Sequence, residues 1–362
     1  MIQFRTISQL VNLYILPEIN KRIQSGKINK NKLPLELFCF RIIQKKGKNK
    51  KIIPIVELNE EVKIKVTVKI KKRVKKGELL TIDDIYPEET YIIPPTFNNK
   101  PAAYFLGISI LFGYDLIFDC LPNLTNIKRE EINKLKPKYP ILQYLNNKSF
   151  NNNVKPLEKI QIISKNNWPP SPGYYPQVLL ELHNDPRLIN KSKFVHIVSK
   201  AYNKNYFNSR LNFWKETNFF PERIQYLESS INSHFSNDYI SSIYVLVPQF
   251  EGIVRDYLKS CKMNDCNGFI NNISKLHKLI LSRKILMFPR KILDIIFDYL
   301  KNGTFWKHTT SISNPQTTIN RHGILHGIFT GFECKEISLK YLILLDSLFF
   351  VILHDKMLNG TI

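Results

Sequence analysis

Glycine is scarce in this chain, with 13 residues among 362. The two glycine-rich signatures of phosphate-binding loops, G-x-G-x-x-G and G-x-x-x-x-G-K-[ST], do not occur. These loops need glycine where the backbone approaches the phosphate groups closely. The sequence therefore excludes the P-loop nucleotidases and the dinucleotide-binding Rossmann enzymes.

Cysteine is also sparse, and its distribution excludes a disulfide scaffold. Small secreted proteins of that kind have a dense and even set of cysteines. An odd, scattered set is typical of a reducing compartment, so we expect a cytoplasmic protein. The five cysteines are Cys39, Cys120, Cys261, Cys266 and Cys334.

Long apolar runs are absent as well. The most apolar window covers fifteen residues, 339–353, and includes Lys340 and Asp346. A transmembrane helix needs about 20 predominantly apolar residues. Near the N-terminus, Asn12 and Pro17 interrupt the apolar stretch before a signal-peptide core can form. We therefore expect a soluble chain without a membrane partner.

Acidic residues are outnumbered, with 30 Asp and Glu against 53 Lys and Arg, which gives a net charge of +23. Such an excess favours a polyanionic partner, and we expect RNA. The excess is greatest over residues 44–76, where 13 basic residues face three acidic ones.

Within this basic region, residues 62–70 alternate between apolar side chains and mostly lysine. A period of two predicts a β-strand with an apolar face and a basic face. The basic turn over residues 45–51 and a second possible strand over residues 52–58 complete a predicted β-hairpin. The hairpin is either an RNA-binding platform or a solvated edge guarded by lysines. The RNA-binding candidates are Lys63, Lys65, Lys69, Lys71, Lys72 and Arg73.

Composition and periodicity divide the chain into three regions. Residues 1–133 are predicted to form a mixed α+β domain that contains the basic hairpin. Residues 134–218, rich in Asn and Pro, are predicted to form a connecting region. Residues 219–362 are predicted to form an all-α bundle. The fold class predicted for the whole chain is therefore α+β.

Helical periodicity dominates the last region. A helix opens at Pro221, and residues 236–238 end it and cap the next one. That next helix keeps one apolar stripe in phase across Pro248, which predicts a single kinked helix. Further helices are predicted over 270–286 and 292–300. The final helix, about 337–353, is apolar nearly all round, as expected at the centre of a bundle or in a dimer interface. The stripe comprises Ile240, Ile243, Val247, Phe250, Val254, Tyr257 and Cys261.

The segment between the last two long helices concentrates cationic and imidazole side chains: Asn320, Arg321, His322 and His326. An arginine binds phosphate bidentately, and a histidine moves protons near neutral pH. These two functions suffice to cleave RNA, because the ribose 2′-hydroxyl is an internal nucleophile beside the scissile phosphate. In a regular helix Arg321 and His326 would lie about 140° apart. Their convergence on one phosphate therefore requires a helix start, the long reach of the arginine side chain or a partner subunit.

The segment NRHGILHG, the apolar helix after it and the preceding fragment VPQFEGIVRDYL together resemble the HEPN superfamily over residues 219–362. Many members are RNases with an Arg-x4–6-His motif in a small helical bundle. The resemblance implies catalytic roles for Arg321, His326 and His322, with Asn320 as an auxiliary donor. It also implies a homodimer through the C-terminal helices, a regulatory partner protein, and a toxin or anti-phage defence role.

Other readings of these residues stay open. Glu251 and Arg255 are auxiliary candidates near the cleft, or a surface ion pair at i,i+4 spacing. His322 and His326 also have the i,i+4 spacing of metal ligands, but no Glu follows His322 as in the H-E-x-x-H pattern. We expect neither a metal nor a cofactor. The alternative to a nuclease is a non-catalytic HEPN-like module for RNA or nucleotide binding or for dimerisation.

Overall fold

The structure is a computed structural model of the whole chain. In the N-terminal part it describes residues 15–27, 37–46, 52–58, 65–67, 69–75, 84–86, 89, 91–93, 102–110 and 113–119. From residue 153 to residue 359 it describes the chain except for residues 173–175, 191, 217–219, 265–267, 284–289 and 312–317.

The chain separates into two compact units, which we describe one at a time. Unit 1 contains residues 1–153, 284–288 and 357–362, and unit 2 contains residues 154–283 and 289–356. This division differs from the three predicted regions. The segment from residue 154 to residue 218 was predicted as the later part of a connecting region, but it belongs to unit 2 and most of its described residues are helical.

Unit 1 holds helix α2 and the described strands. Four strands pair in the order β2–β1–β5–β6, all antiparallel, and Lys46 of β1 faces Ile52 of β2. Strands β3 and β4 form a separate antiparallel pair. The bounds are α2 (Leu16–Gln24), β1 (Leu37–Lys46), β2 (Ile52–Leu58), β3 (Lys65–Thr67), β4 (Tyr91–Ile93), β5 (Ala102–Ile110) and β6 (Gly113–Asp119).

The strand predicted over residues 52–58 is confirmed as β2. Of the strand predicted over residues 62–70, residues 65–67 form β3, which pairs with β4 rather than with β2, while residues 62–64 and 68 lie outside the described residues. An isolated bridge joins Ile70 to Ile85, and Ile70 remains 39% exposed. A period of two specifies a buried face only where another element covers that face. The alternating pattern therefore does not by itself make this segment pair with residues 52–58 in a hairpin.

The predicted fold class, α+β with a basic hairpin, is wrong. The described residues are mostly helical, since helices contain more than three times as many residues as strands. The error arises mainly in residues 154–218, where a polar, proline-containing sequence forms short helices. Each of these helices buries only a few apolar side chains, such as Ile163, Phe194 and Phe207. Most residues of these helices lie on exposed faces and are polar. The segment as a whole is therefore polar, and its apolar residues do not stand out as a helical repeat.

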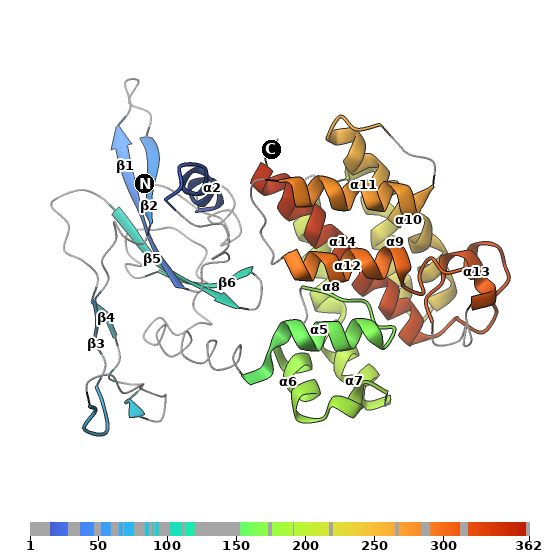
Figure 1. Cartoon of the computed structure of the whole chain (residues 1–362), viewed down its shortest axis with the longest axis horizontal. Coiled ribbons are helices and arrows are strands. Elements are labelled where there is room, and N and C mark those ends of the chain that lie inside the picture. Colours follow the sequence, from blue (N-terminus) through green and yellow to red (C-terminus); the bar gives the residue numbers. More distant parts are fainter. Residues whose placement is uncertain are drawn as a thin grey trace. The chain divides into compact units, whose positions relative to one another are not determined.

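Unit 2 is built from helices in all its described parts (Figure 1). The α-helices are α5 (Pro156–Lys165), α6 (Pro176–Asn184), α7 (Ser192–Ala201), α8 (Lys204–Glu216), α9 (Ile224–Phe235), α10 (Tyr239–Ser260), α11 (Phe269–Ser282), α12 (Arg290–Asn302), α13 (Arg321–Leu325) and α14 (Lys335–Asn359). Three short 3-10 helices connect them: η6 (Pro186–Asn190), η7 (Pro221–Arg223) and η8 (Thr309–Ser311).

The helices predicted after residue 219 are confirmed as α9, α10, α11, α12 and α14. Asp238 caps α10 as predicted, because its side chain accepts a hydrogen bond from the backbone N–H of Ser241 at 3.0 Å. Pro248 lies inside α10, which continues across it as one helix. The predicted stripe of α10 is buried from Ile243 to Tyr257, whereas Ile240 at its start is 52% exposed.

Helix α14 is the central element of unit 2. Its apolar side chains are buried on every side, including Leu339, Leu342, Leu345 and Leu348. The prediction of a helix central to a bundle is therefore confirmed. Because these side chains are already covered within the chain, the apolar surface of α14 is not available to a second subunit.

Two acidic residues of α14 are nevertheless buried, and each has a cationic partner. Asp346 is 1% exposed and accepts hydrogen bonds from Tyr206 Oη at 2.5 Å and from Arg210 Nε at 2.7 Å. These bonds join α8 to the middle of α14. A buried carboxylate needs such partners, because an unpaired charge in the core costs several kcal/mol.

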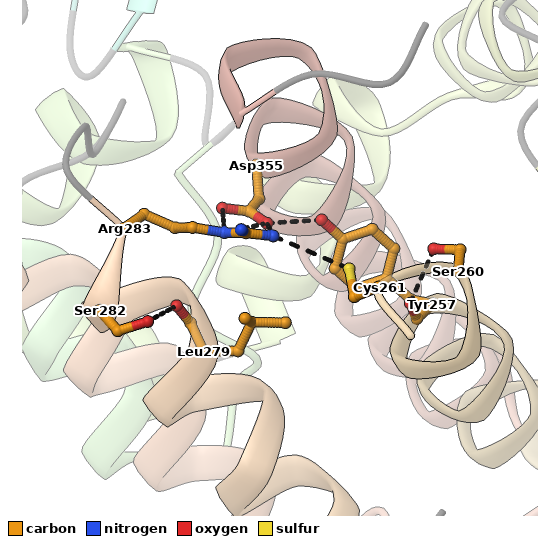
Figure 2. A network of polar contacts seen from close by, with 7 residues as sticks. All are labelled: Tyr257, Ser260, Cys261, Leu279, Ser282, Arg283 and Asp355. Atoms are coloured by element: carbon orange, nitrogen blue, oxygen red, sulfur yellow. Dashed lines mark hydrogen bonds and ion pairs between the residues drawn. The ribbon is translucent and has the colours of Figure 1, made fainter. Parts of the chain in front are cut away.

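The second acidic residue, Asp355, joins α14 to α10 and to the end of α11 (Figure 2). It accepts hydrogen bonds from Tyr257 Oη at 2.5 Å and from Arg283 Nη2 at 3.1 Å. Arg283 Nη2 also lies 3.7 Å from Cys261 Sγ. Burial and the charge of Asp355 raise the pKa of Tyr257, so its hydroxyl stays protonated and donates.

A neutral polar network joins α9, α10 and α14. His234 Nδ1 lies 2.8 Å from Ser338 Oγ, and Ser338 Oγ lies 2.9 Å from Ser242 Oγ. Ser230 Oγ donates to the backbone carbonyl of Ser242 at 2.7 Å. Burial, with a smaller contribution from the charge of Lys335, lowers the pKa of His234 to about 4. The imidazole is therefore neutral at pH 7.

Among the helices that the structure describes, none has the length and apolar character needed to cross a bilayer.

The buried pair on α14 gives a first stability prediction. Asp346→Ala leaves Arg210 in the core without its carboxylate, and we expect the free energy of unfolding to fall by about 3–5 kcal/mol. Urea denaturation measures this change. The control is Glu228→Ala, which breaks the exposed Lys215–Glu228 pair (2.8 Å) and should cost less than about 1 kcal/mol. Equal losses in the two variants would contradict the role of Asp346.

A second prediction concerns pH. Because the pKa of His234 is about 4 in the folded state and about 6.5 when unfolded, its contribution is fully present above pH 6.5. Stability is lost as the pH falls towards 4, by about 3 kcal/mol from this group. We expect His234→Gln to reduce the difference in unfolding free energy between pH 6.5 and pH 4. Exposed His183→Gln should leave that difference unchanged, and a wild-type slope in His234→Gln would refute the assignment.

Candidate functional site

The predicted motif lies on the short helix α13, which Asn320 holds in place. Asn320 is fully buried, and its Oδ1 accepts the backbone N–H of Gly323 at 2.7 Å. Its Nδ2 donates to the carbonyls of Thr304 and Lys307, both at 2.8 Å. Both amide hydrogens are therefore used within the protein, so Asn320 positions the motif and is not free to donate to a phosphate as predicted.

The chain folds back on itself directly after α13. The backbone N–H groups of Ile328 and Phe329 both donate to the carbonyl of Gly323 at 2.9 Å. A Cβ at Gly323 would lie 2.3 Å from the ring of Phe329, and Gly327 has φ +66°. Both glycines are thus required by the turn. The helix ends at Leu325, and the backbone N–H of His326 still donates to the carbonyl of His322 at 3.1 Å, so the two histidines lie one helical turn apart on the same side.

Glu251 of α10 binds Arg321. Arg321 Nη2 donates to Glu251 Oε2 at 2.7 Å, and Arg255 Nη2 donates to Glu251 Oε1 at 3.1 Å. The two auxiliary candidates are therefore an i,i+4 ion pair, and they also contact the motif arginine. Arg321 Nε is buried and has no hydrogen-bond partner among the described residues.

Trp306 and the two histidines extend this contact. The guanidinium carbon of Arg321 lies 4.5 Å from the centroid of the Trp306 ring. The His322 ring meets the same indole edge-to-face at 4.9 Å, and the His326 ring stacks on His322 at 5.8 Å with an interplanar angle of 9°. We call these residues the Arg–His cluster: Glu251, Arg255, Trp306, Arg321, His322 and His326.

Aromatic packing supports the cluster from the core side. Phe305 packs against Phe250 of α10 at 5.0 Å and against Tyr341 of α14 at 6.0 Å between ring centroids. Phe305 directly precedes Trp306 in the sequence, and Phe250 directly precedes Glu251. The central helix α14 thereby fixes the backbone that carries the cluster.

Electrostatics keep His322 neutral. Partial burial and the neighbouring charges of Arg321 and His326 lower the pKa of His322. At pH 7 its ring therefore has one N–H donor and one acceptor nitrogen. His326 is exposed, and the side chain of Arg321 is 18% exposed. The cluster can thus present a cation and imidazoles to a molecule at the surface of unit 2.

The sequence did not identify Trp306 or His308 as part of a site. Trp306 joins Arg321 to His322, and His308 is close enough to contribute to the lowered pKa of His322. His308 Nδ1 also lies 2.8 Å from Thr310 Oγ1. Both residues precede the motif by more than ten positions, and they are brought near by the Asn320 bonds to residues 304 and 307 and by the backbone bond from Arg321 to Phe305 at 2.9 Å. No local pattern signals this proximity.

The predicted RNA-binding residues of unit 1 are partly committed to other contacts. Lys69 pairs with Glu89 at 2.8 Å and Lys72 with Asp84 at 2.9 Å, while Lys71 Nζ lies 5.6 Å from the centroid of the Tyr86 ring. Arg73 is exposed. Lys63 and the side chain of Lys65 lie outside the described residues. The ion pairs reduce the local positive charge, which fits the alternative of a solvated edge.

In the part of the chain that the structure describes, no group of three or more His, Cys, Asp or Glu residues is arranged to hold a metal ion. The donors that the Arg–His cluster offers are instead guanidinium and imidazole N–H groups. Such donors suit an anion with several oxygen atoms.

Comparison with known proteins finds no matching family model, no matching curated protein and no matching solved structure. The resemblance to the HEPN superfamily therefore stays a prediction from the motif and its sequence context.

The position of Asn320 gives a third prediction. Asn320→Ala removes the cap of α13 and leaves two carbonyls without their donor, and we expect unfolding free energy to fall by about 2–4 kcal/mol. The control is Asn203→Ala at the start of α8. Asn203 caps α8 at an exposed position, so its loss should cost only about 0.5–1 kcal/mol. Chemical denaturation measures both, and similar losses would show that Asn320 does not hold the motif.

Proposed function

We propose that the chain is a HEPN-like, metal-independent endoribonuclease whose catalytic groups lie in the Arg–His cluster. The substrate is RNA, and the reaction is attack of the ribose 2′-hydroxyl on the adjacent phosphorus. The new bond joins the 2′-oxygen to phosphorus and the bond to the 5′-oxygen breaks. The products are a 2′,3′-cyclic phosphate and a free 5′-hydroxyl.

The observation that carries this proposal is the chain of contacts from Glu251 through Arg321 and Trp306 to His322 and His326. The sequence alone gives an arginine and two histidines without their relative positions. In the fold Trp306 contacts both Arg321 and His322, and His322 stacks on His326. A cation and two imidazoles linked in this way are the groups that metal-free phosphoryl transfer needs.

Roles follow from exposure and charge. His326 is exposed and takes the proton of the 2′-hydroxyl, then returns a proton to the leaving 5′-oxygen. Arg321, whose side chain is 18% exposed, stabilises the charge of the phosphorane with its guanidinium. His322 is neutral and adds an N–H donor. Glu251 positions Arg321 through their 2.7 Å contact.

The partners remain part of the proposal. RNA and a second copy of the chain are the partners implied by the motif, together with a toxin or anti-phage defence role and a cytoplasmic location. Because α14 is covered within unit 2, a homodimer has to use other helices. Exposed apolar side chains on α10, Ile240 at 52% and Tyr244 at 42%, are available for this contact.

The test is incubation of the purified full chain with total cellular RNA in EDTA, followed by analysis of the cut ends. We expect cutting that leaves 2′,3′-cyclic phosphates. His326→Ala should lose at least about 100-fold in rate, the usual contribution of a general acid–base group. The matched control is His183→Ala, which removes an exposed imidazole of α6 and should cut like the wild type.

Two results would count against the nuclease. Equal cutting by His326→Ala and the wild type would assign the activity to a contaminant. No cutting, with RNA binding retained in both proteins, would favour the non-catalytic RNA-binding module.

A further inference from the structure

A pocket separate from the Arg–His cluster lies within unit 2, between the C-terminal end of α5, helix α7 and the start of α14. Its volume is about 940 Å³. Small-molecule and cofactor sites occupy about 300–1,000 Å³, so this pocket is large enough for a molecule of nucleotide size. None of the cluster residues lines it.

The lining is strongly cationic. Lys165 at the end of α5 and Lys335 at the start of α14 are exposed, and His196 of α7 lines the same space. The acidic residue among the lining side chains is Glu336, and its carboxylate is paired with Lys340 at 2.7 Å. The pocket therefore has at least two lysine charges that its own lining does not neutralise.

Lys340 makes the site more than a basic surface. Its side chain is 3% exposed, and its ammonium lies 4.7 Å from the centroid of the Trp168 ring. Burying a lysine is costly unless its charge is matched. Glu336 provides one match, and this carboxylate is itself 27% exposed at the pocket. An anion in the pocket would meet a cation that is already fixed in position.

Neutral donors complete the lining. Ser199 of α7 has a buried hydroxyl with no hydrogen-bond partner among the described residues. Asn167 and Ser192 contribute further polar groups, and Val195 contributes an apolar wall.

We propose that this pocket binds a small molecule carrying two or more phosphate charges, held by Lys165, Lys335 and Lys340. Lysines at separate positions act as point charges, which suits a polyphosphate better than a single carboxylate. The size of the pocket leaves room for an attached sugar and base. This binding does not depend on the proposed nuclease activity, because the two sites share no residue.

The test is isothermal titration of the full chain at 150 mM salt with ATP and, separately, with inorganic pyrophosphate. We expect saturable binding of at least one of them, weakened tenfold or more in the double variant Lys165→Ala/Lys335→Ala. The control is Lys193→Ala, which removes an exposed lysine of α7 outside the pocket and should bind like the wild type. Because the substituted lysines are exposed, circular dichroism should show unchanged helicity in all variants.

The two probes separate the sources of the phosphate. Tighter binding of ATP than of pyrophosphate would show that the nucleoside part is held too, whereas equal binding would limit recognition to the phosphates. Absence of binding to both would overturn the proposal. Equal weakening by the double variant and by Lys193→Ala would overturn it as well, since it would show non-specific attraction to a basic surface.

Discussion

The need to match charge in the core of unit 2 determines how its helices are arranged. Helix α14 is buried on every side, yet it carries charged residues whose desolvation costs several kcal/mol unless a partner is supplied. Two of the partners come from other helices, so matching those charges also fixes α8 and the end of α11 against α14. The pairs are Asp346 with Arg210 and Asp355 with Arg283, while Lys340 pairs with Glu336 within α14 itself. Apolar packing supplies most of the stabilisation, but it is not directional. The charged pairs between helices set where each neighbouring helix lies along α14.

Much of unit 2 was predictable from the sequence, because long helices with a buried face leave a repeating apolar pattern. Helices α9 to α12 and α14 were found in this way, including the cap at Asp238. Helices α5 to α8 were not, because the Asn and Pro content of their segment predicted a connecting region and each helix buries only a few apolar side chains. In unit 1 the alternation over residues 62–70 was misleading. An alternating strand forms where another element covers its apolar face, and the alternation does not tell which element that is.

The candidate site was predictable only in part, for a similar reason. The chemical character of Arg321, His322 and His326 was evident from their types and spacing. Their geometry depends on contacts distant in sequence: Asn320 with the carbonyls of residues 304 and 307, and Arg321 with Glu251 of α10. Asn320 shows the difference most clearly, since a polar residue beside a motif suggests a ligand contact, while its complete burial shows a structural role.

The aromatic contacts behind the cluster have a consequence for how the protein is made. A helix as short as α13 is not stable by itself, and its surroundings include Phe305, which packs against Tyr341 of α14. The ribosome synthesises the motif before it synthesises α14. A nascent chain therefore contains the arginine and both histidines before it contains the core that arranges them. The site comes into being only when the last long helix has docked, so the order of synthesis itself delays the appearance of any activity it has.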